Sequence, residues 1–155
     1  MPFSHFPTMR QGIYALLMVT AQVSPIFFSP LPAHAADSKD LRVIGQWRLT
    51  AALDHSEISA LDEQEAGQLV GKIMLITQDS VRFGTRKCLP PALDAALVQP
   101  KLYLRKQAHA DSSMLHLPNP VTVVNLGCTI AFVKNPNHLV IHWDGWFFDA
   151  ARVKK

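Results

Sequence analysis

The 155-residue sequence carries little net charge and has no cluster of basic residues. It contains 15 Lys and Arg residues and 12 Asp and Glu residues, a formal net charge of +3 at pH 7. The longest basic runs are pairs such as Arg86-Lys87 and Arg105-Lys106. Proteins that bind nucleic acid concentrate Lys and Arg on one face or along one helix. The scattered charges therefore argue against a nucleic-acid partner.

The sequence also lacks the short motifs of common catalytic and metal sites. It has no Gly-x-Ser-x-Gly, no His-Glu-x-x-His and no Cys-x-x-Cys, the arrangements that supply a nucleophile, a zinc site or a redox pair. The adjacent acids Asp62 and Glu63 are better explained by the start of a helix. We therefore expect a protein that is not an enzyme and that uses no cofactor.

No apolar run is long enough to cross a membrane. The longest, residues 13–28, is interrupted by polar residues and a proline, whereas a spanning helix needs about 20 apolar residues. The run follows Arg10 and precedes Ala33-His34-Ala35, which has the small-x-small form of a cleavage site. This pattern predicts a secretory signal peptide over residues 1–35. We therefore expect a periplasmic or secreted protein with no stable membrane span after cleavage.

Cysteine is scarce: Cys88 and Cys128 are the two in the chain, and both follow the predicted signal peptide. In an oxidising compartment an even number of cysteines usually forms disulfides. A metal or redox role is the alternative, but two cysteines without spaced histidines are too few ligands for structural zinc. We therefore predict a Cys88–Cys128 disulfide. It would close a loop of about 40 residues and stabilise the fold by about 3–4 kcal/mol.

The remaining chain reads as one domain, residues 42–155, after a polar leader at 36–41. The acid-rich stretch 59–71, opened by Ser59 and Asp62, predicts a helix. Short alternating apolar segments predict strands, which are expected at residues 42–51, 72–77, 80–83, 121–124, 129–133 and in a hairpin over 139–153.

The middle of the chain is harder to interpret. Two prolines make residues 86–91 a predicted loop. Residues 92–120 show no clear pattern beyond a possible strand at 101–105. The whole pattern predicts a mainly β protein, a small antiparallel barrel or sandwich of about seven or eight strands with one short helix.

The C-terminal hairpin gives the clearest local prediction. Asp144-Gly145 separates two alternating apolar segments and is typical of a type I′ turn. If these residues form the turn, Trp143 faces Trp146 and both share one buried face with Phe148.

The opposite face of this hairpin would carry His138, His142 and Asp149. Two imidazoles and a carboxylate on one sheet face are possible ligands for Zn²⁺ or Cu²⁺. The alternative, which we favour, is that this face is plain solvent surface and binds no metal.

Three arginines are candidate contacts. Arg82 and Arg152 lie in otherwise apolar segments, and Arg86 opens the predicted loop. Because a buried Arg needs partners, either Arg82 or Arg152 could meet an anionic ligand. Arg82 and Arg86 are the possible contacts for a ligand or a protein partner. The alternative is that such an Arg stacks on an aromatic ring or extends to the surface.

Gly45-x-Trp47 on the first expected strand, with Arg152 on the last, resembles the lipocalin (calycin) pattern. In that family the Arg of the terminal strand packs across the Trp of the first strand and closes the barrel. The resemblance implies a barrel closed by Gly45, Trp47 and Arg152.

A wider resemblance covers most of residues 42–153. Residues 69–72 and 79–84, the two cysteines, and Trp143-Asp144-Gly145-x-Phe147-Phe148 are similar to a group of small exported proteobacterial proteins of unknown function. This resemblance implies a periplasmic domain with one disulfide and implies no activity.

These observations lead to one expected function and one alternative. We expect a periplasmic binding module of lipocalin-like type whose ligand is an unknown small apolar or amphipathic molecule. The alternative is a protein-binding inhibitor or immunity-type protein that acts on a cell-envelope enzyme through a loop at residues 86–91 or 108–120.

Overall fold

The structure, a computed structural model, describes residues 38–154. The predicted signal peptide, residues 1–35, lies outside the described residues. No helix within residues 38–154 has the length and hydropathy to span a membrane.

The strands are β1 (Ser38–Lys39), β2 (Gly45–His55), β3 (Ile73–Ile76), β4 (Val81–Phe83), β5 (Arg86–Cys88), β6 (Asp94–Val98), β7 (Val121–Asn125), β8 (Ile130–Asn135), β9 (His138–Trp143) and β10 (Trp146–Arg152). The helical segments are η1 (Leu41–Val43), α1 (Glu63–Leu69), α2 (Pro100–Gln107) and η2 (Ser113–Leu115), of which η1 and η2 are 3₁₀ turns.

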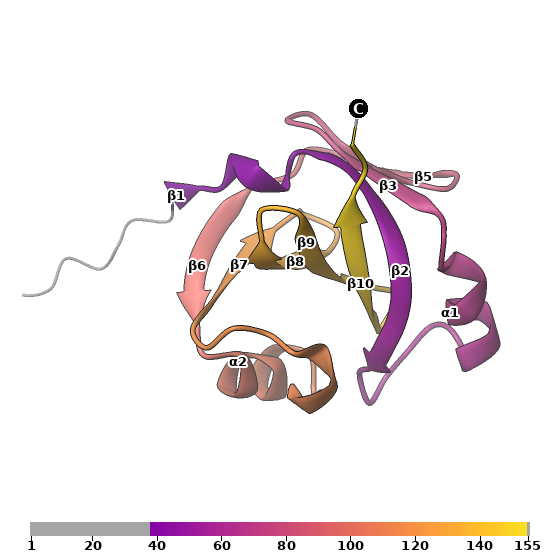
Figure 1. The fold of residues 1–155 in the computed structure, drawn as a ribbon, viewed down its shortest axis with the longest axis vertical. Coiled ribbons are helices and arrows are strands. Elements are labelled where there is room, and N and C mark those ends of the chain that lie inside the picture. Colours follow the sequence, from indigo (N-terminus) through magenta and orange to yellow (C-terminus); the bar gives the residue numbers. More distant parts are fainter. Residues whose placement is uncertain (1–37, 155) are drawn as a thin grey trace, which may run out of the picture. The chain divides into compact units, whose positions relative to one another are not determined.

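All these strands belong to one antiparallel sheet in which most strands pair with their neighbours along the chain. From β2 to β5, and again from β6 to β10, each strand pairs with the next, and β10 returns to pair with β2. β5 and β6 do not pair; β5 forms one edge of the sheet, and β1, added to β6, forms the other. The sheet curls into a half-barrel (Figure 1), with the curved strands β2 and β6 on opposite sides. The predicted fold class, mainly β and barrel-like, is confirmed.

The disulfide fastens the open side of the sheet. Cys88 at the end of β5 bonds to Cys128 in the turn between β7 and β8, with an Sγ–Sγ distance of 2.07 Å. The predicted Cys88–Cys128 disulfide is therefore confirmed. It ties the edge strand β5 to the half of the sheet with which β5 does not pair.

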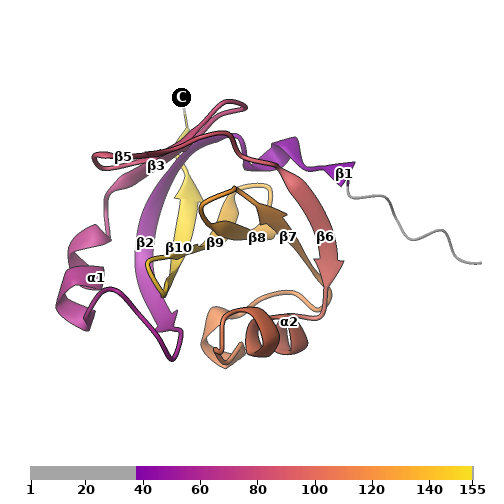
Figure 2. The same cartoon turned by 180° about the vertical axis from the view of Figure 1, so that it is seen from behind.

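Two apolar cores lie on the two faces of the central strands. The inner core, inside the curl, contains Trp47, Met74, Trp143, Trp146 and Phe148 among its larger side chains. The second core lies on the other face, where α2 and η2 cover β7 to β10 (Figure 2). Its members include Leu104, Leu115, Phe132, Val140 and Phe147.

The second core corrects the expectation that one face of the hairpin is plain solvent surface. Val140 and Phe147 lie on that face and are fully buried. The sequence carries the signal in its continuous apolar runs Leu139-Val140-Ile141 and Trp146-Phe147-Phe148. A strand that is buried on both faces has such a run in place of strict alternation.

The possible strand at 101–105 is wrong, because these residues lie within α2. Pro100 occupies the first turn of this helix, where its missing N–H costs nothing. Leu104 and Ala108, four residues apart, are both buried against the second core. Leu102 and Leu104 on either side of Tyr103 imitate the alternation of a strand, which explains the error.

Four other segments differ from expectation. Residues 86–88 form β5 and end just before the prolines, and 94–98 form β6 within the stretch that showed no pattern. Residues 38–41, expected to be part of a polar leader, form β1 and begin η1. Helix α1 begins at Asp62, which forms a reciprocal capping box with Glu65, and not at Ser59.

Candidate functional site

The terminal hairpin fills the inside of the half-barrel with aromatic rings. β9 and β10 pair with Trp143 opposite Trp146 and Ile141 opposite Phe148. Asp144 and Gly145 have φ values of 52° and 89°, as a type I′ turn requires. Trp143 is 5% exposed and Trp146 is 9% exposed. Because these side chains occupy the concave face, a ligand site has to be sought at the ends or outer surface of the sheet.

Arg152 and Trp47 join the last strand to the first long strand. The two residues are directly paired between β10 and β2, and the guanidinium carbon of Arg152 lies 4.2 Å from the centroid of the Trp47 ring. Trp47 is fully buried, and its Nε1 donates a hydrogen bond of 2.7 Å to the Val43 carbonyl. The stack lies where an up-and-down barrel would bring its first and last strands together.

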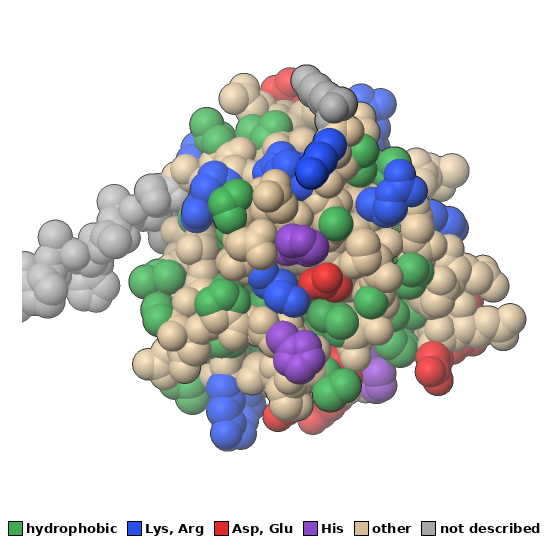
Figure 3. Space-filling model, viewed as in Figure 1, with side chains coloured by type: hydrophobic (Ala, Val, Ile, Leu, Met, Phe, Trp, Pro, Cys, Tyr) green, Lys and Arg blue, Asp and Glu red, His purple; other side chains and the backbone are tan. Residues whose placement is uncertain are grey.

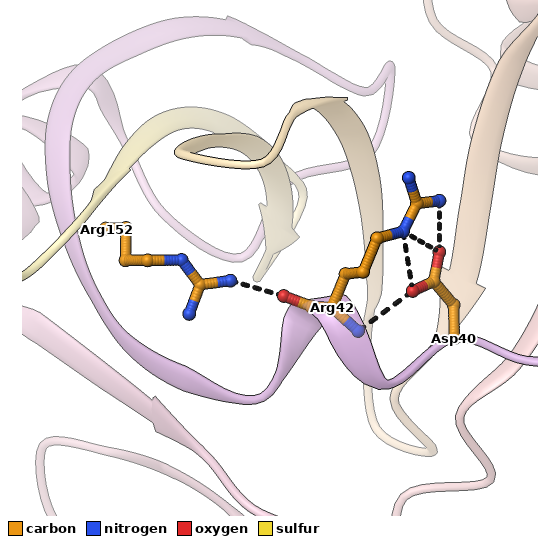
Figure 4. Close-up of polar contacts among 3 residues, drawn as sticks. All are labelled: Asp40, Arg42 and Arg152. Atoms are coloured by element: carbon orange, nitrogen blue, oxygen red, sulfur yellow. Dashed lines mark hydrogen bonds and ion pairs between the residues drawn. The ribbon is translucent and has the colours of Figure 1, made fainter.

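Backbone carbonyls, and no carboxylate, hold the Arg152 guanidinium. Its Nε donates to the carbonyl of Pro136 and its Nη1 to that of Ile44, each at 3.0 Å, and its Nη2 donates to the carbonyl of Arg42 (Figure 4). The side chain of Arg42 is itself paired with Asp40, and these hydrogen bonds hold the pKa of Asp40 below its ordinary value. Within residues 38–154, Arg152 forms no ion pair.

Gly45 makes room for this guanidinium. Its φ is +147°, and a Cβ atom at this position would lie 2.6 Å from Nη1 of Arg152. Both the backbone conformation and the close approach therefore favour glycine. The Gly-x-Trp spacing places Gly45 and Trp47 on the same face of β2, so the glycine admits the guanidinium that the tryptophan receives.

A groove of about 670 Å³ adjoins this stack at one end of the sheet. It lies where β2 begins, β3 ends and the chain leaves β10, and a hydrogen bond of 2.9 Å from the Val153 amide to the Gln46 carbonyl continues the pairing there. Three of its lining residues have apolar side chains that reach the surface: Ile44, Leu75 and Val153. Ile76 also lines it, but its side chain is fully buried in the inner core. Gly45, Gln46 and Thr77 also line it, and its charged lining residues are Arg152 and Lys154.

Comparison with known proteins gives no assignment. No family model, no curated protein and no solved structure matches the chain. The function therefore has to be argued from the geometry of this chain.

The two other candidate arginines differ in their environment. Arg86 forms an ion pair with Asp144 and lies over Trp143, with its guanidinium carbon 4.4 Å from the ring centroid. Its charge is therefore neutralised within the chain. Both side chains are exposed, but within residues 38–154 Arg82, on β4, forms no ion pair.

The three possible metal ligands on the outer face of the hairpin are not brought together. Asp149 lies 4.0 Å from Nδ1 of His138, but the Nζ atom of Lys134 lies 3.0 Å from its other carboxylate oxygen. His142 turns away to Ser56. Figure 3 shows His, basic and acidic side chains side by side at the centre of its face. Within residues 38–154, no three His, Cys, Asp or Glu side chains form a group suited to a metal ion.

A polar cleft at the other end of β2 was not foreseen from the sequence. The Oγ atom of Ser56 lies 3.1 Å from Nε2 of His142, and both line a cavity of about 370 Å³. Burial lowers the pKa of His142, and the nearby charge of Asp144 opposes this shift. The two residues are 86 positions apart, so no local sequence pattern signals their contact.

This Ser–His pair has the groups of a nucleophile and a base but lacks an orienting partner. No carboxylate within residues 38–154 accepts a hydrogen bond from His142. Ser56 is only 6% exposed, and its amide donates a 2.7 Å hydrogen bond to the Gly145 carbonyl. These contacts tie the pair to the hairpin turn.

Proposed function

We propose that the chain is an exported binding module that holds a small apolar or amphipathic molecule in the groove beside Arg152. The observation that carries this proposal is the groove itself. Its volume, about 670 Å³, lies within the roughly 300–1,000 Å³ range typical of small-molecule sites. The exposed surface of the groove is mainly apolar, with Ile44, Leu75 and Val153 beside a smaller polar part, which is the usual composition of such sites.

The proposed site is at an end of the sheet and not inside it. A lipocalin-like carrier would be expected to hold its ligand in the barrel interior, but Trp47, Trp143 and Trp146 occupy the inner core here. The pairing of β10 with β2 and the Arg152–Trp47 stack still support a relation to lipocalin-like architecture.

Export is part of the same proposal. The Cys88–Cys128 disulfide supports it, because structural disulfides persist mainly in oxidising compartments such as the periplasm. A second support is the composition of residues 1–35, an apolar segment followed by a small-x-small sequence. Mass spectrometry of the protein from a periplasmic extract should find a chain that begins at Ala36; an intact N-terminus would contradict export by signal cleavage.

Titration with the neutral fluorescent probe N-phenyl-1-naphthylamine tests the groove. We expect saturable binding by the oxidised protein, and at least a fivefold weaker Kd in a Leu75→Gln variant, because Leu75 lines the groove. A Leu97→Gln variant is the matched control, because Leu97 is 70% exposed on β6, away from the groove. Absence of saturable binding, or equal loss in both variants, would contradict the proposal.

A second candidate is a protein-binding inhibitor, favoured by the exposed side chain of Leu89. This residue is 67% exposed and directly follows Cys88, whose disulfide holds the loop in place. A loop that is already held in place loses less conformational freedom when it binds a partner. Affinity capture from a periplasmic extract should retain one stoichiometric partner that a Leu89→Asp variant loses and a Leu102→Asp variant keeps. A partner retained by all three proteins would remove this candidate.

A further inference from the structure

We infer that the outer face of strands β2 to β5 docks on a bilayer of anionic phospholipid. The residues that would make the contact, which we name the cationic face, are Arg48 on β2, Ile73 on β3, Arg82 on β4 and Lys87 on β5. The inference goes beyond the proposed function and does not depend on a ligand in the groove. It is carried by the strand register, by the exposure of these side chains and by their charge.

The strand register brings these scattered residues onto one face of the sheet. Arg82 pairs with Leu75 on β3 and with Lys87 on β5. Arg48 pairs with Ile73 at alternate positions of β2 and β3. The positions between them belong to the inner core: Trp47, Met74, Ile76, Val81 and Phe83. Because side chains alternate between the two faces of a strand, the cationic face is the outer, convex face of this part of the sheet.

The cationic face is open to solvent. Arg48, Arg82 and Lys87 are exposed, and Ile73 is 40% exposed. The outer face of β7 to β10 differs, because α2 and η2 cover it. β3 and β5 lie on the side of the half-barrel away from α2 (Figure 1), and Figure 3 shows several Lys and Arg side chains over this part of the surface. This face is therefore accessible to an external partner.

The cationic face carries charge of one sign. Where β2 to β5 pair, the outward positions hold three cations and no acid: Gln46, Arg48, Ile73, Leu75, Arg82 and Lys87. Within residues 38–154, none of these three cations forms an ion pair. Asp79 lies beyond the ends of β3 and β4, in the turn that joins them. An anionic surface is therefore the complement of this face.

The pairing of Arg82 with Lys87 is unfavourable in the free chain. The two residues lie directly opposite each other on β4 and β5. Side chains in such positions have Cβ atoms about 5 Å apart, and like charges there destabilise a sheet. An anionic surface bound over both cations would offset their repulsion. The pair therefore opposes folding of the free chain and favours binding to an anionic surface.

A lipid surface fits the cationic face better than an acidic protein does. Protein interfaces are depleted in Lys and depend on close shape complementarity. The headgroups of an anionic bilayer attract Lys and Arg without a fixed geometry, and each cation near the surface strengthens binding by about fivefold. Ile73, directly opposite Arg48, adds an exposed aliphatic side chain that can enter the boundary between headgroups and acyl chains.

Co-sedimentation of the oxidised protein with vesicles tests this inference. We expect about tenfold stronger binding to phosphatidylcholine vesicles that contain about 30% phosphatidylglycerol than to pure phosphatidylcholine, and weaker binding at high salt. Lys87→Glu should weaken binding to the anionic vesicles by about tenfold. Lys101→Glu is the matched control, because it makes the same change of charge at an exposed position in the first turn of α2. It should weaken binding by less than about twofold.

The melting temperature separates a loss of docking from a loss of folding. Lys87→Glu should raise the melting temperature, because it places an opposite charge across from Arg82. Should this variant fail to fold, Arg48→Gln decides the matter, with an expected loss of about fivefold in vesicle binding. Equal binding to both vesicle compositions, or equal losses in Lys87→Glu and Lys101→Glu, would overturn the inference. Binding of poly-L-glutamate without binding of anionic vesicles would also overturn it, and would indicate an acidic protein partner.

Discussion

Two arginines stack on tryptophan rings in this half-barrel, and they differ in whether a carboxylate is paired with the guanidinium. Arg86 lies over Trp143 and is paired with the carboxylate of Asp144. Arg152 lies over Trp47 at nearly the same distance, 4.2 Å against 4.4 Å, but its hydrogen bonds go to carbonyls. The contact with the ring is the same in both stacks, and the anion partner is present in only one. In the Arg86 stack a carboxylate of the same chain neutralises the positive charge. In the Arg152 stack, within residues 38–154, no carboxylate neutralises it.

The largest expected effect comes from removing the disulfide that holds β5, the strand that carries Arg86. Replacing both cysteines by alanine should lower the free energy of unfolding by about 3–4 kcal/mol, because the 40-residue separation of the bridge leaves a long unconstrained loop in the unfolded chain. Urea denaturation measures this loss. An Arg82→Met variant on the neighbouring strand β4 is the control and should change stability by less than about 0.5 kcal/mol. A double variant as stable as the wild type would show that β5 is held without the bridge.

At the other stack, Gly45→Ala should be the most damaging single change. The added Cβ would lie 2.6 Å from Nη1 of Arg152 at a backbone φ of +147°, so we expect a loss of about 2–3 kcal/mol. Gly67→Ala, in α1 with open space around it, is the matched control and should be neutral or stabilising. Equal effects of the two changes in thermal unfolding would mean that Arg152 does not require the glycine.

The two arginines can then be compared directly. Arg152→Met should cost about 1–2 kcal/mol, because it removes the contact with a fully buried ring and leaves three carbonyls without their donors. Arg86→Met should cost less than about 1 kcal/mol, because the Arg86 side chain in its ion pair with Asp144 is 55% exposed. Denaturation of both variants at low and high salt checks this order, and only the Arg86 contribution should shrink with salt. The reverse order of losses would contradict the comparison.

The smallest expected effect is a pH dependence at the turn that carries Asp144. Burial lowers the pKa of His142 in the folded chain, so the unfolded chain binds a proton more readily. Its neutral form therefore supports stability above pH of about 6.5, and this support is lost as the pH falls through the folded pKa. The melting temperature should fall on acidification from pH 7.5 to 5.5, and His142→Gln should flatten that slope. His138→Gln is the control, and a flattened slope in it would contradict the assignment.

Several features could be predicted because their signals are local. Asp144-Gly145 between alternating segments specifies the register of the hairpin, and the acid-rich turn around Asp62 specifies a helix start within a few residues. The disulfide followed from the number of cysteines and the predicted export. Each of these inferences depends on residues close together in the sequence or on a simple count.

The features that were missed depend on contacts between distant segments. The groove is lined by residues 44–46, 75–77 and 152–154, which meet only because β2 pairs with both β3 and β10. The burial of Phe147 depends on α2, whose pattern resembled a strand. The contact of Ser56 with His142 joins a loop to a strand far along the chain. Sequence periodicity reports which face of an element is apolar and does not report which element covers it.

The most direct test of the central claim, that the groove binds a small apolar molecule, is a ¹H–¹⁵N NMR titration of the oxidised protein with N-phenyl-1-naphthylamine. We predict chemical-shift changes at the backbone amides of Gln46, Leu75 and Val153, which line the groove. The amide of Glu57, in the polar cleft at the other end of β2, should not change. Changes centred on that cleft, or none at the groove, would contradict the account.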